Sequence, residues 1–154
     1  MKPRKKRDVL YPPGIRYFKP QGIPKNNLNN VYVTVDEYEA IRLADHEKLN
    51  HEKAAKRMNI SRPTFTRLLE SAHNKIGDAI VNGKAVRIEG GDFNFLGNRL
   101  RCRRCGFYWN INKKKNNILS CQNCGSIDIE DIGKNMTRNS VKGKRSRFGR
   151  GWNK

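Results

Sequence analysis

The sequence predicts a mainly α fold, in which a three-helix domain with a helix-turn-helix precedes a small all-β zinc ribbon and both termini are basic and flexible. Three observations lead to this prediction. Residues 51–69 have the residue types of two helices joined by a tight turn, four cysteines form two CxxC pairs, and basic residues concentrate at both ends. The expected segments are a partly packed N-terminal arm (1–30), a helix-turn-helix domain (31–92), a zinc ribbon (93–133) and a basic disordered tail (134–154).

The N-terminal arm is basic and interrupted by prolines. Residues 1–30 carry eight basic side chains and one acidic side chain, and Lys5, Lys6 and Arg7 lie in the cluster at the start. Proline-interrupted sequence forms neither helices nor central strands. We expect the first seven or eight residues to be free and to contact DNA along the minor groove or backbone. A solvated tail that only aids solubility is the alternative.

The first helix of the domain is predicted from its capping residues. Thr34 and Glu37 have the spacing of a capping box, so a helix is expected to begin there and to run to about Asp45. Three acidic residues, Asp36, Glu37 and Glu39, crowd its start, which suits the helix dipole and would keep this helix off DNA. At the other end of the domain, residues 85–91 (AVRIEGG) alternate like a short strand, and their glycine pair resembles a hinge.

Residues 51–69, HEKAAKRMNISRPTFTRLL, predict a helix, a tight turn and a second helix. Asn59 stands at the turn, where a left-handed backbone is needed and Asn is tolerated better than most residues. Ser61 can cap the second helix, and Pro63 falls in its first turn, where a missing N–H costs little. The residues expected to face inward are Ala54, Ala55, Met58, Ile60, Phe65 and Leu68. The pattern favours a helix-turn-helix over an ordinary helical hairpin.

The start of the second of these helices offers side chains suited to a DNA major groove. Arg62 and Arg67 can contact phosphates or guanine edges, and Thr64 and Thr66 can contact phosphates or base edges. These four residues, with Lys5, Lys6 and Arg7 of the arm, are the predicted DNA contacts.

Two cysteine pairs predict one metal site. Cys102 and Cys105 form the first CxxC, Cys121 and Cys124 form the second, and fifteen residues separate the pairs. Four thiolates at this spacing suit tetrahedral coordination of one structural Zn²⁺ ion. Iron in a rubredoxin-like site is the main alternative, and a redox role for CxxC lacks the βαβ frame that it requires. Nearby aromatic and basic residues could stack on bases or form the small core of the ribbon.

Two parts of the chain resemble a known family. The stretch FKPQGIP (18–24) and the long stretch from TVDEYEAIRLAD through SRPTF to RIEGG (34–91) resemble a prokaryotic family catalogued as domain of unknown function 134. That family is predicted to bind DNA, and its helical unit is similar to the fourth region of bacterial sigma factors. The resemblance covers roughly residues 8–92 and implies a fold and DNA binding, but no target. Where members usually have Gly at the turn, this chain has Asn59.

Charge and composition narrow the classes of function. The formal net charge is +19, which favours a polyanionic partner, most simply nucleic acid. No apolar run has the length of a membrane span and no signal-peptide core follows the basic start, so we expect a cytoplasmic, nucleoid-associated protein without a membrane partner. No phosphate loop, activated nucleophile or open metal site is present in the sequence, so we do not expect an enzyme.

The sequence therefore predicts a DNA-binding transcriptional regulator that reads double-stranded DNA through its helix-turn-helix. An RNA- or ribosome-associated protein that uses ribbon and tail is the second hypothesis. A third is an adaptor whose ribbon binds a partner in the transcription machinery. A homodimer is a further possibility, because many such readers cover two half-sites.

Overall fold

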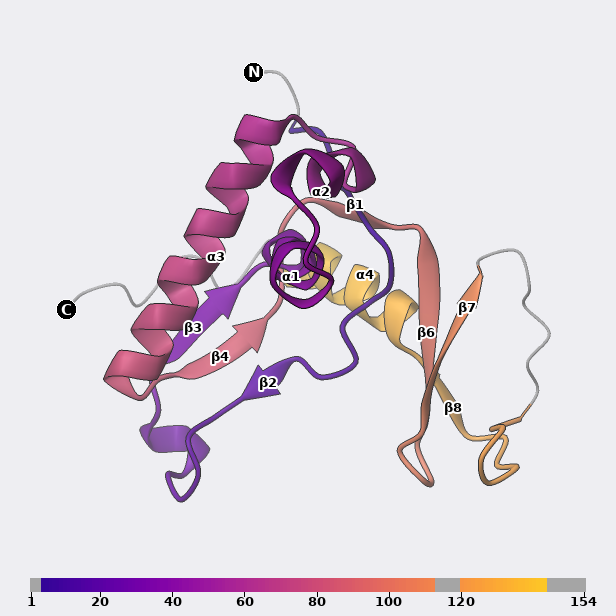
Figure 1. Cartoon of the computed structure of the whole chain (residues 1–154). Helices are drawn as coiled ribbons and strands as arrows, with labels where there is room; N and C mark the ends of the chain where they lie inside the picture. Colours follow the sequence, from indigo (N-terminus) through magenta and orange to yellow (C-terminus); the bar gives the residue numbers. More distant parts are fainter. Residues whose placement is uncertain (1–3, 113–119, 144–154) are drawn as a thin grey trace.

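The computed structural model describes residues 4–112 and 120–143, which form four α-helices, two shorter helical turns and eight strands (Figure 1). The strands are β1 (Arg7–Val9), β2 (Tyr17–Phe18), β3 (Asn30–Val33), β4 (Ala85–Ile88), β5 (Phe93–Phe95), β6 (Gly97–Cys102), β7 (Tyr108–Asn112) and β8 (Ile129–Asp131). The helices are α1 (Val35–Ile41), α2 (His51–Arg57), α3 (Arg62–Asn82) and α4 (Ile132–Gly143), with a 3-10 turn η1 (Lys25–Asn27) and a π-helical turn η2 (Arg42–His46). None of the helices in these described ranges is both long and apolar enough to cross a membrane.

The prediction of a mainly α protein with a three-helix domain is wrong, because the helices are built onto small sheets. β3 pairs in parallel with β4, and β2 pairs antiparallel with the other edge of β4. β1 pairs in parallel with β5, which lies more than eighty residues away in the chain. β6, β7 and β8 form the third sheet, which is antiparallel. The fold is therefore mixed α and β.

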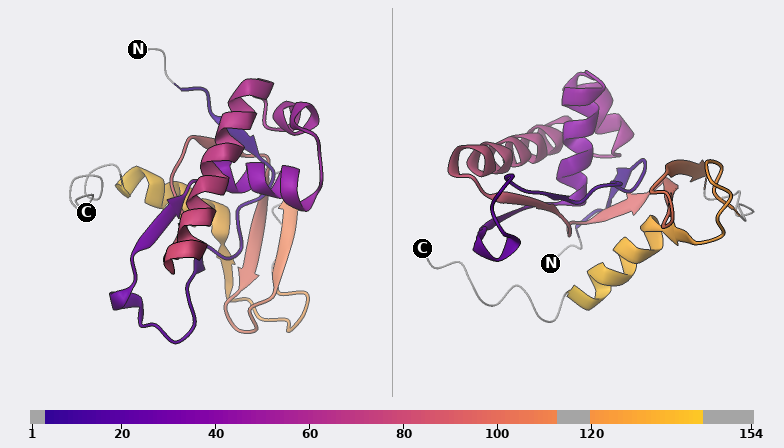
Figure 2. Two further views of the ribbon diagram at one scale, coloured as in Figure 1. Left: turned by 60° about the vertical axis from the view of Figure 1, so that its left-hand side comes forward. Right: turned by 90° about the horizontal axis from the view of Figure 1, so that it is seen from below.

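The strands lie between two helical layers. Seen from below, α2 and α3 lie on one side of the strands and α4 lies on the other (Figure 2). One apolar cluster joins these layers; it contains Val9, Val33, Val35, Ile88, Phe95, Ile132 and Met136. These residues come from β1, β3, β4, β5, α1 and α4, so the N-terminal arm, the helical part and the segment after the cysteines share one core.

The helix boundaries agree with the capping residues of the sequence. Thr34 and Glu37 form the complete capping box at the start of α1, and Asn50 caps α2 by accepting a hydrogen bond from the Lys53 N–H. α3 ends at Gly83, whose backbone is left-handed. The second cluster, between α1, η2, α2 and α3, contains Ala40, Leu43, Ala54, Ala55, Met58, Phe65 and Leu69.

Three carboxylates on α1 are buried, and each binds a different part of the chain. Asp36, Glu37 and Glu39 are only 2%, 4% and 2% exposed. Asp36 pairs with Arg7 at 2.8 Å, which fixes β1. Glu37 accepts hydrogen bonds from Lys75 and from the Ser71 hydroxyl of α3; Glu39 accepts two from the Arg42 guanidinium and one from the Leu10 N–H. These side chains thus hold the arm, α3 and η2 around α1, beyond the dipole role expected of them.

The glycine pair after β4 is a packed corner rather than a hinge. The Gly90 carbonyl accepts a hydrogen bond from the Val35 N–H at 3.0 Å. A Cβ atom at Gly91 would lie 2.4 Å from Asp36 Oδ1 and 2.9 Å from the Thr34 Cβ, and the backbone there has φ +95°. Only glycine fits between this corner and the start of α1.

We therefore expect Gly91→Ala to destabilise the fold by about 1–3 kcal/mol, from overpacking and an unfavourable φ. Gly90→Ala is the matched control, because Gly90 also has positive φ (+81°) but no atom within 4 Å of the position that a Cβ would occupy. The midpoint of urea unfolding, monitored by circular dichroism, measures both. Equal losses for the two variants would show that crowding against Asp36 contributes nothing.

The segment after the ribbon contains a helix, α4, where the sequence predicts a disordered tail from residue 134. Asp131 accepts a hydrogen bond from the Lys134 N–H at 2.9 Å, as an N-capping residue does. Ile132 and Met136, four residues apart, are buried in the first cluster. The cap and this spacing were the available signals in the sequence. Residues 144–154 of the predicted tail lie outside the described residues.

Candidate nucleic-acid interface and metal centre

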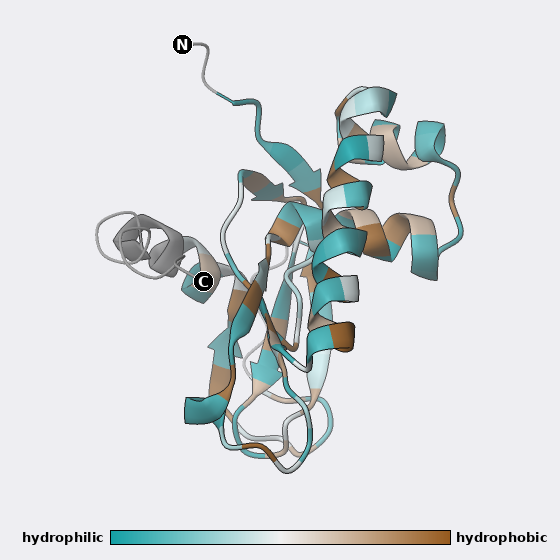
Figure 3. Ribbon diagram, turned by 90° about the vertical axis from the view of Figure 1, so that its left-hand side faces the viewer, coloured by the Kyte–Doolittle hydropathy of each residue, from teal (hydrophilic) through white to brown (hydrophobic). Residues whose placement is uncertain are grey.

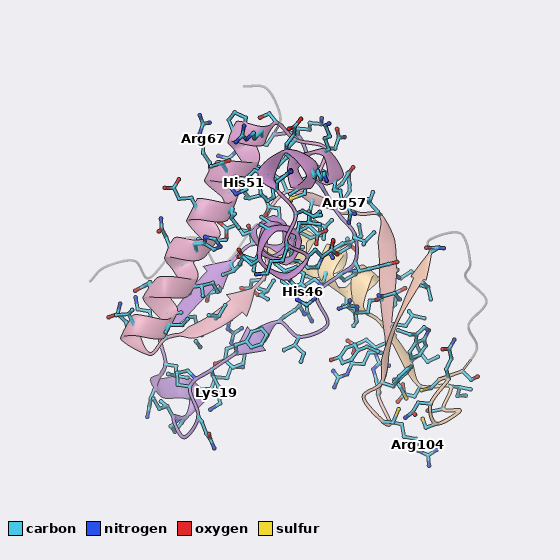
Figure 4. All side chains as sticks on the ribbon, viewed as in Figure 1. Lys19, His46, His51, Arg57, Arg67 and Arg104 are labelled. Atoms are coloured by element: carbon cyan, nitrogen blue, oxygen red, sulfur yellow. The ribbon has the colours of Figure 1, made fainter. Side chains whose placement is uncertain are left out.

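The four residues predicted to contact the DNA major groove lie on the first two turns of α3. Arg62, Thr66 and Arg67 are exposed, and neither arginine forms an ion pair with another described residue. Figure 4 shows Arg67 projecting outward from one end of the molecule. The face of α3 turned to the viewer in Figure 3 is mainly hydrophilic, so this helix presents polar side chains to solvent along much of its length.

Both threonines of this set are partly engaged within the protein. Thr64 is half-buried, and its hydroxyl lies 2.8 Å from the Ser61 hydroxyl, which also accepts a hydrogen bond from the Thr64 N–H at the start of α3. The Thr66 hydroxyl lies 2.9 Å from His51 Nδ1, and the His51 ring packs edge-on against Phe65. The cap prediction for Ser61 is confirmed, and the side chains left uncommitted on this turn are the two arginines.

The turn before α3 has the predicted shape and also contacts the N-terminal arm. Asn59 has φ +56°, which is left-handed as expected. Its side-chain oxygen accepts a hydrogen bond from Lys5 Nζ at 3.1 Å. A few residues further along the arm, the Asp8 N–H donates to the Met58 carbonyl at 3.0 Å. The arm therefore lies against the turn from about Lys5 onward.

Of the three arm residues predicted to contact DNA, Arg7 has a structural role. Its guanidinium is held by buried Asp36, and its backbone N–H donates to the Asp92 carbonyl. Lys5 and Lys6 remain exposed. The difference arises because β1 pairs with β5, a pairing between distant segments that the local sequence does not indicate.

A basic groove lies where the arm meets the turn, and we call it the arm groove. It is lined by Arg4, Lys5, Arg7, Lys56, Asn59, Ile60, Ser61 and Thr64. Four of these side chains are basic and none is acidic. The sequence analysis did not assign Lys56 or Asn59 to a DNA-contacting surface. The available signal was the place of Lys56 on the predicted helix, one turn before the turn residue Asn59.

The four cysteines meet at one point. Their Sγ atoms all lie within 4.8 Å of one another, with Cys102 and Cys124 3.6 Å apart and Cys105 and Cys121 3.7 Å apart. A metal–sulfur bond of about 2.3 Å in a tetrahedral site implies sulfur–sulfur separations of roughly 3.8 Å. The predicted cysteines therefore fit a single tetrahedral metal ion.

The two CxxC segments have the same backbone geometry. In the first, the Gly106 N–H donates to the Cys102 carbonyl, and the Cys102 N–H donates to the carbonyl of Phe107. In the second, Gly125 and Cys121 repeat this pattern. Gly106 and Gly125 have φ of +77° and +74°, so glycine at these positions lets each loop turn back over its cysteines.

Hydrogen bonds tune the thiols unequally. The Asn123 side chain donates toward Cys105 Sγ at 3.6 Å and lowers the pKa of that thiol to about 6. The backbone N–H of Ser126 lowers the pKa of Cys124, but burial and the neighbouring thiols outweigh it and raise the value to about 11. Four crowded sulfurs without a cation resist losing all their protons, and a bound cation removes that resistance.

The sheet of β6, β7 and β8, which carries the predicted ribbon, packs on a small core of its own and on the rest of the protein. Trp109, Leu100, Cys102 and Cys121 form the internal cluster. Tyr108 instead packs against the first cluster and donates from its hydroxyl to the Gly14 carbonyl at 3.2 Å. Phe107 is exposed and stacks against Trp109. In Figure 4, Arg104 beside the first CxxC lies at the opposite end of the molecule from Arg67.

The family model and similar proteins agree on one family for this chain. The family model described as "Protein of unknown function DUF134" matches residues 1–96. A UPF0251 protein of Moorella thermoacetica is 45% identical over 145 residues, which cover 94% of each chain. A UPF0251 protein of Desulforudis audaxviator is 44% identical over 128 residues, covering 83% of this chain and 84% of the relative. No solved structure matches significantly. The Moorella alignment extends past the family model, so this likeness includes the cysteine region.

Proposed function

The chain belongs to the family of proteins of unknown function DUF134, and we propose that it binds double-stranded DNA through α2, the following turn and α3, as a transcriptional regulator rather than an enzyme. One observation carries this proposal: Arg62 and Arg67 project from the start of α3 without an ion-pair partner among the described residues, beside the basic arm groove. A helix that presents its first turns in this way suits the major groove, and adjacent cations suit the phosphate backbone.

The charges on α1 and α2 also favour DNA binding at this end of the molecule. The carboxylates Asp36, Glu37 and Glu39 are buried and paired, so they do not repel DNA from this end. Among the described residues of α2, Glu52 is the acidic one; it lies 3.7 Å from Lys56, and both side chains are well exposed. An exposed pair of this kind contributes little and separates easily.

We expect Arg67→Ala to reduce discrimination between a selected DNA site and random DNA by about 1–3 kcal/mol if Arg67 reads a base. The site is first obtained by genome-wide binding in the host or by selection from random duplexes. Fluorescence anisotropy at two salt concentrations then measures both affinities. Arg104→Ala is the control, because it removes the same charge at the other end of the molecule. An equal loss on both DNAs would make Arg67 a phosphate contact instead.

We also propose that the four cysteines hold one structural Zn²⁺ ion. The sulfur spacing fits a four-thiolate site, and all four positions are filled by protein, so no position remains for substrate or water. Thiolates bind iron with the same geometry. Metal analysis of purified protein, together with the visible absorption of an iron–thiolate centre, distinguishes the two metals.

RNA binding by the ribbon is the second candidate function, favoured by the position of Arg104 and exposed Phe107 at the end away from Arg67. Cations beside an exposed aromatic ring suit unpaired bases. A selective loss of structured-RNA binding in Arg104→Ala, with DNA binding unchanged, would support it. If Arg104→Ala reduced neither RNA binding nor DNA binding, the ribbon would be a structural module or a protein-binding one.

A further inference from the structure

The positive charge of the arm groove suits an anionic ligand. Its cations come from two separate parts of the chain, with Arg4 and Lys5 on the arm and Lys56 on α2. Among the described residues no carboxylate lines the groove, and the acidic residue of α2, Glu52, is only loosely paired with Lys56. We propose that this groove is a fixed seat for one backbone phosphate of the DNA bound by α3, an inference that rests on the proposed function.

The seat is fixed because the arm is anchored at Lys5 and at the residues that follow it. Lys5 is bound to Asn59, and three residues further on the Asp8 N–H is bound to Met58. Arg7 between them is held by buried Asp36. Lys5 therefore reaches the groove without the loss of chain entropy that a free arm would suffer on binding.

Lys5 keeps the capacity to bind a phosphate in this position. An ammonium group has three donors, and Asn59 accepts one of them. The other two are available to phosphate oxygens, and Lys56 is exposed across the groove. Contacts of this kind set the register of a protein on the duplex and carry no sequence information. The seat would thus fix how α3 enters the groove.

The first test uses Lys5→Gln and Lys56→Gln in the full-length, metal-loaded chain. Each variant is expected to lower duplex affinity about five- to tenfold at 0.1 M salt and to reduce the slope of log K against log salt by about 1, equally for selected and random DNA. Lys19→Gln removes one positive charge at a position far from Arg67 (Figure 4). This control is expected to leave the duplex affinity and the salt slope unchanged. Unchanged slopes in both groove variants, with normal DNA binding by the parent chain, would overturn the seat and leave the proposed function standing.

A conservative variant separates positioning from charge. Asn59→Gly keeps the left-handed turn but removes the acceptor that holds Lys5. It is expected to weaken duplex binding less than Lys5→Gln and to leave the salt slope unchanged, because the charge remains. An unchanged duplex affinity in Asn59→Gly would show that the fixed position of Lys5 contributes nothing to binding.

Inorganic phosphate tests the seat without DNA. In NMR titrations, the amides of Lys5 and Asn59 are expected to shift in the parent chain and to stay in place in the Lys5→Gln/Lys56→Gln double variant. If duplex DNA does not bind at all, the proposed function fails while this titration still reports on the groove. Shifts of equal size in parent and double variant would overturn the seat.

Discussion

Replacing Cys121 by Ser is expected to release the proposed metal ion and to unfold the ribbon, by which we mean the sheet of β6, β7 and β8 with its two CxxC turns. Structural zinc contributes about 10–16 kcal/mol of apparent binding free energy in small zinc domains, and one missing thiolate removes a large share of it. The internal cluster of this ribbon is small, with Leu100 and Trp109 as its main apolar side chains beside the cysteines. Without metal, that core is too small to hold the strands together.

Hydrogen exchange and metal content measure this effect. In the parent chain the β6 and β7 amides, such as those flanking the Leu100–Trp109 pair, should be protected and one metal ion should bind per chain. In Cys121→Ser, or after chelation, that protection should be lost. Ser120→Ala changes the exposed neighbour of Cys121 and should keep both metal and protection. Persistent protection of β6 in metal-free protein would contradict a metal-dependent ribbon.

The same variant should also weaken the core outside the ribbon. Tyr108 lies between the two CxxC pairs and packs on the first apolar cluster, and Ile132 and Met136, which follow the second pair, belong to that cluster. Loss of the ribbon frees β7 and the start of α4, so residues such as Val9 lose part of their cover. We therefore expect a lower unfolding midpoint for the whole chain, rather than a local change confined to the ribbon.

Glu39→Ala is expected to destabilise the chain by about 3 kcal/mol. Removing one partner of a buried ion pair typically costs about 3–5 kcal/mol because the other charge is left without compensation. Glu39 accepts two hydrogen bonds from Arg42, each 2.7 Å long, and one from the Leu10 N–H. The lower end of the range applies because 20% of the Arg42 side chain is exposed and Glu47 remains as a partner.

Glu47→Ala provides a control that removes the other carboxylate bound to Arg42. Glu47 is 30% exposed and also pairs with exposed Arg57, so its loss should cost less than about 1 kcal/mol. Urea unfolding of both variants gives the comparison. Because Leu10 loses its acceptor, Glu39→Ala should also loosen the arm, which hydrogen exchange at Leu10 reports. Equal and small losses for the two variants would show that burial of Glu39 adds nothing.

Some of this molecule can be predicted from short-range sequence. The capping box of Thr34 and Glu37, the turn at Asn59 and the cap at Ser61 are all interactions between residues close in the chain. The meeting of four cysteines also follows from spacing, because each CxxC pair is local and a metal needs both pairs. These predictions agree with the structure because local chemistry determines them.

The fold class, the docked arm and the roles of the α1 carboxylates depend on contacts between distant segments. β1 pairs with β5 and β3 pairs with β4 across long stretches of chain. The alternation of residues 85–91 correctly indicates the strand β4, but a local pattern does not show which distant strand it pairs with. Asp36 and Glu39 resemble ordinary acidic residues of a first helical turn until Arg7 and Arg42 are seen beside them. The sequence by itself determined the caps, the turn and the two CxxC pairs, since each depends on neighbours in the chain. Only the tertiary structure decided which charges are buried and which remain for a partner, because burial depends on what the rest of the chain places against each side chain.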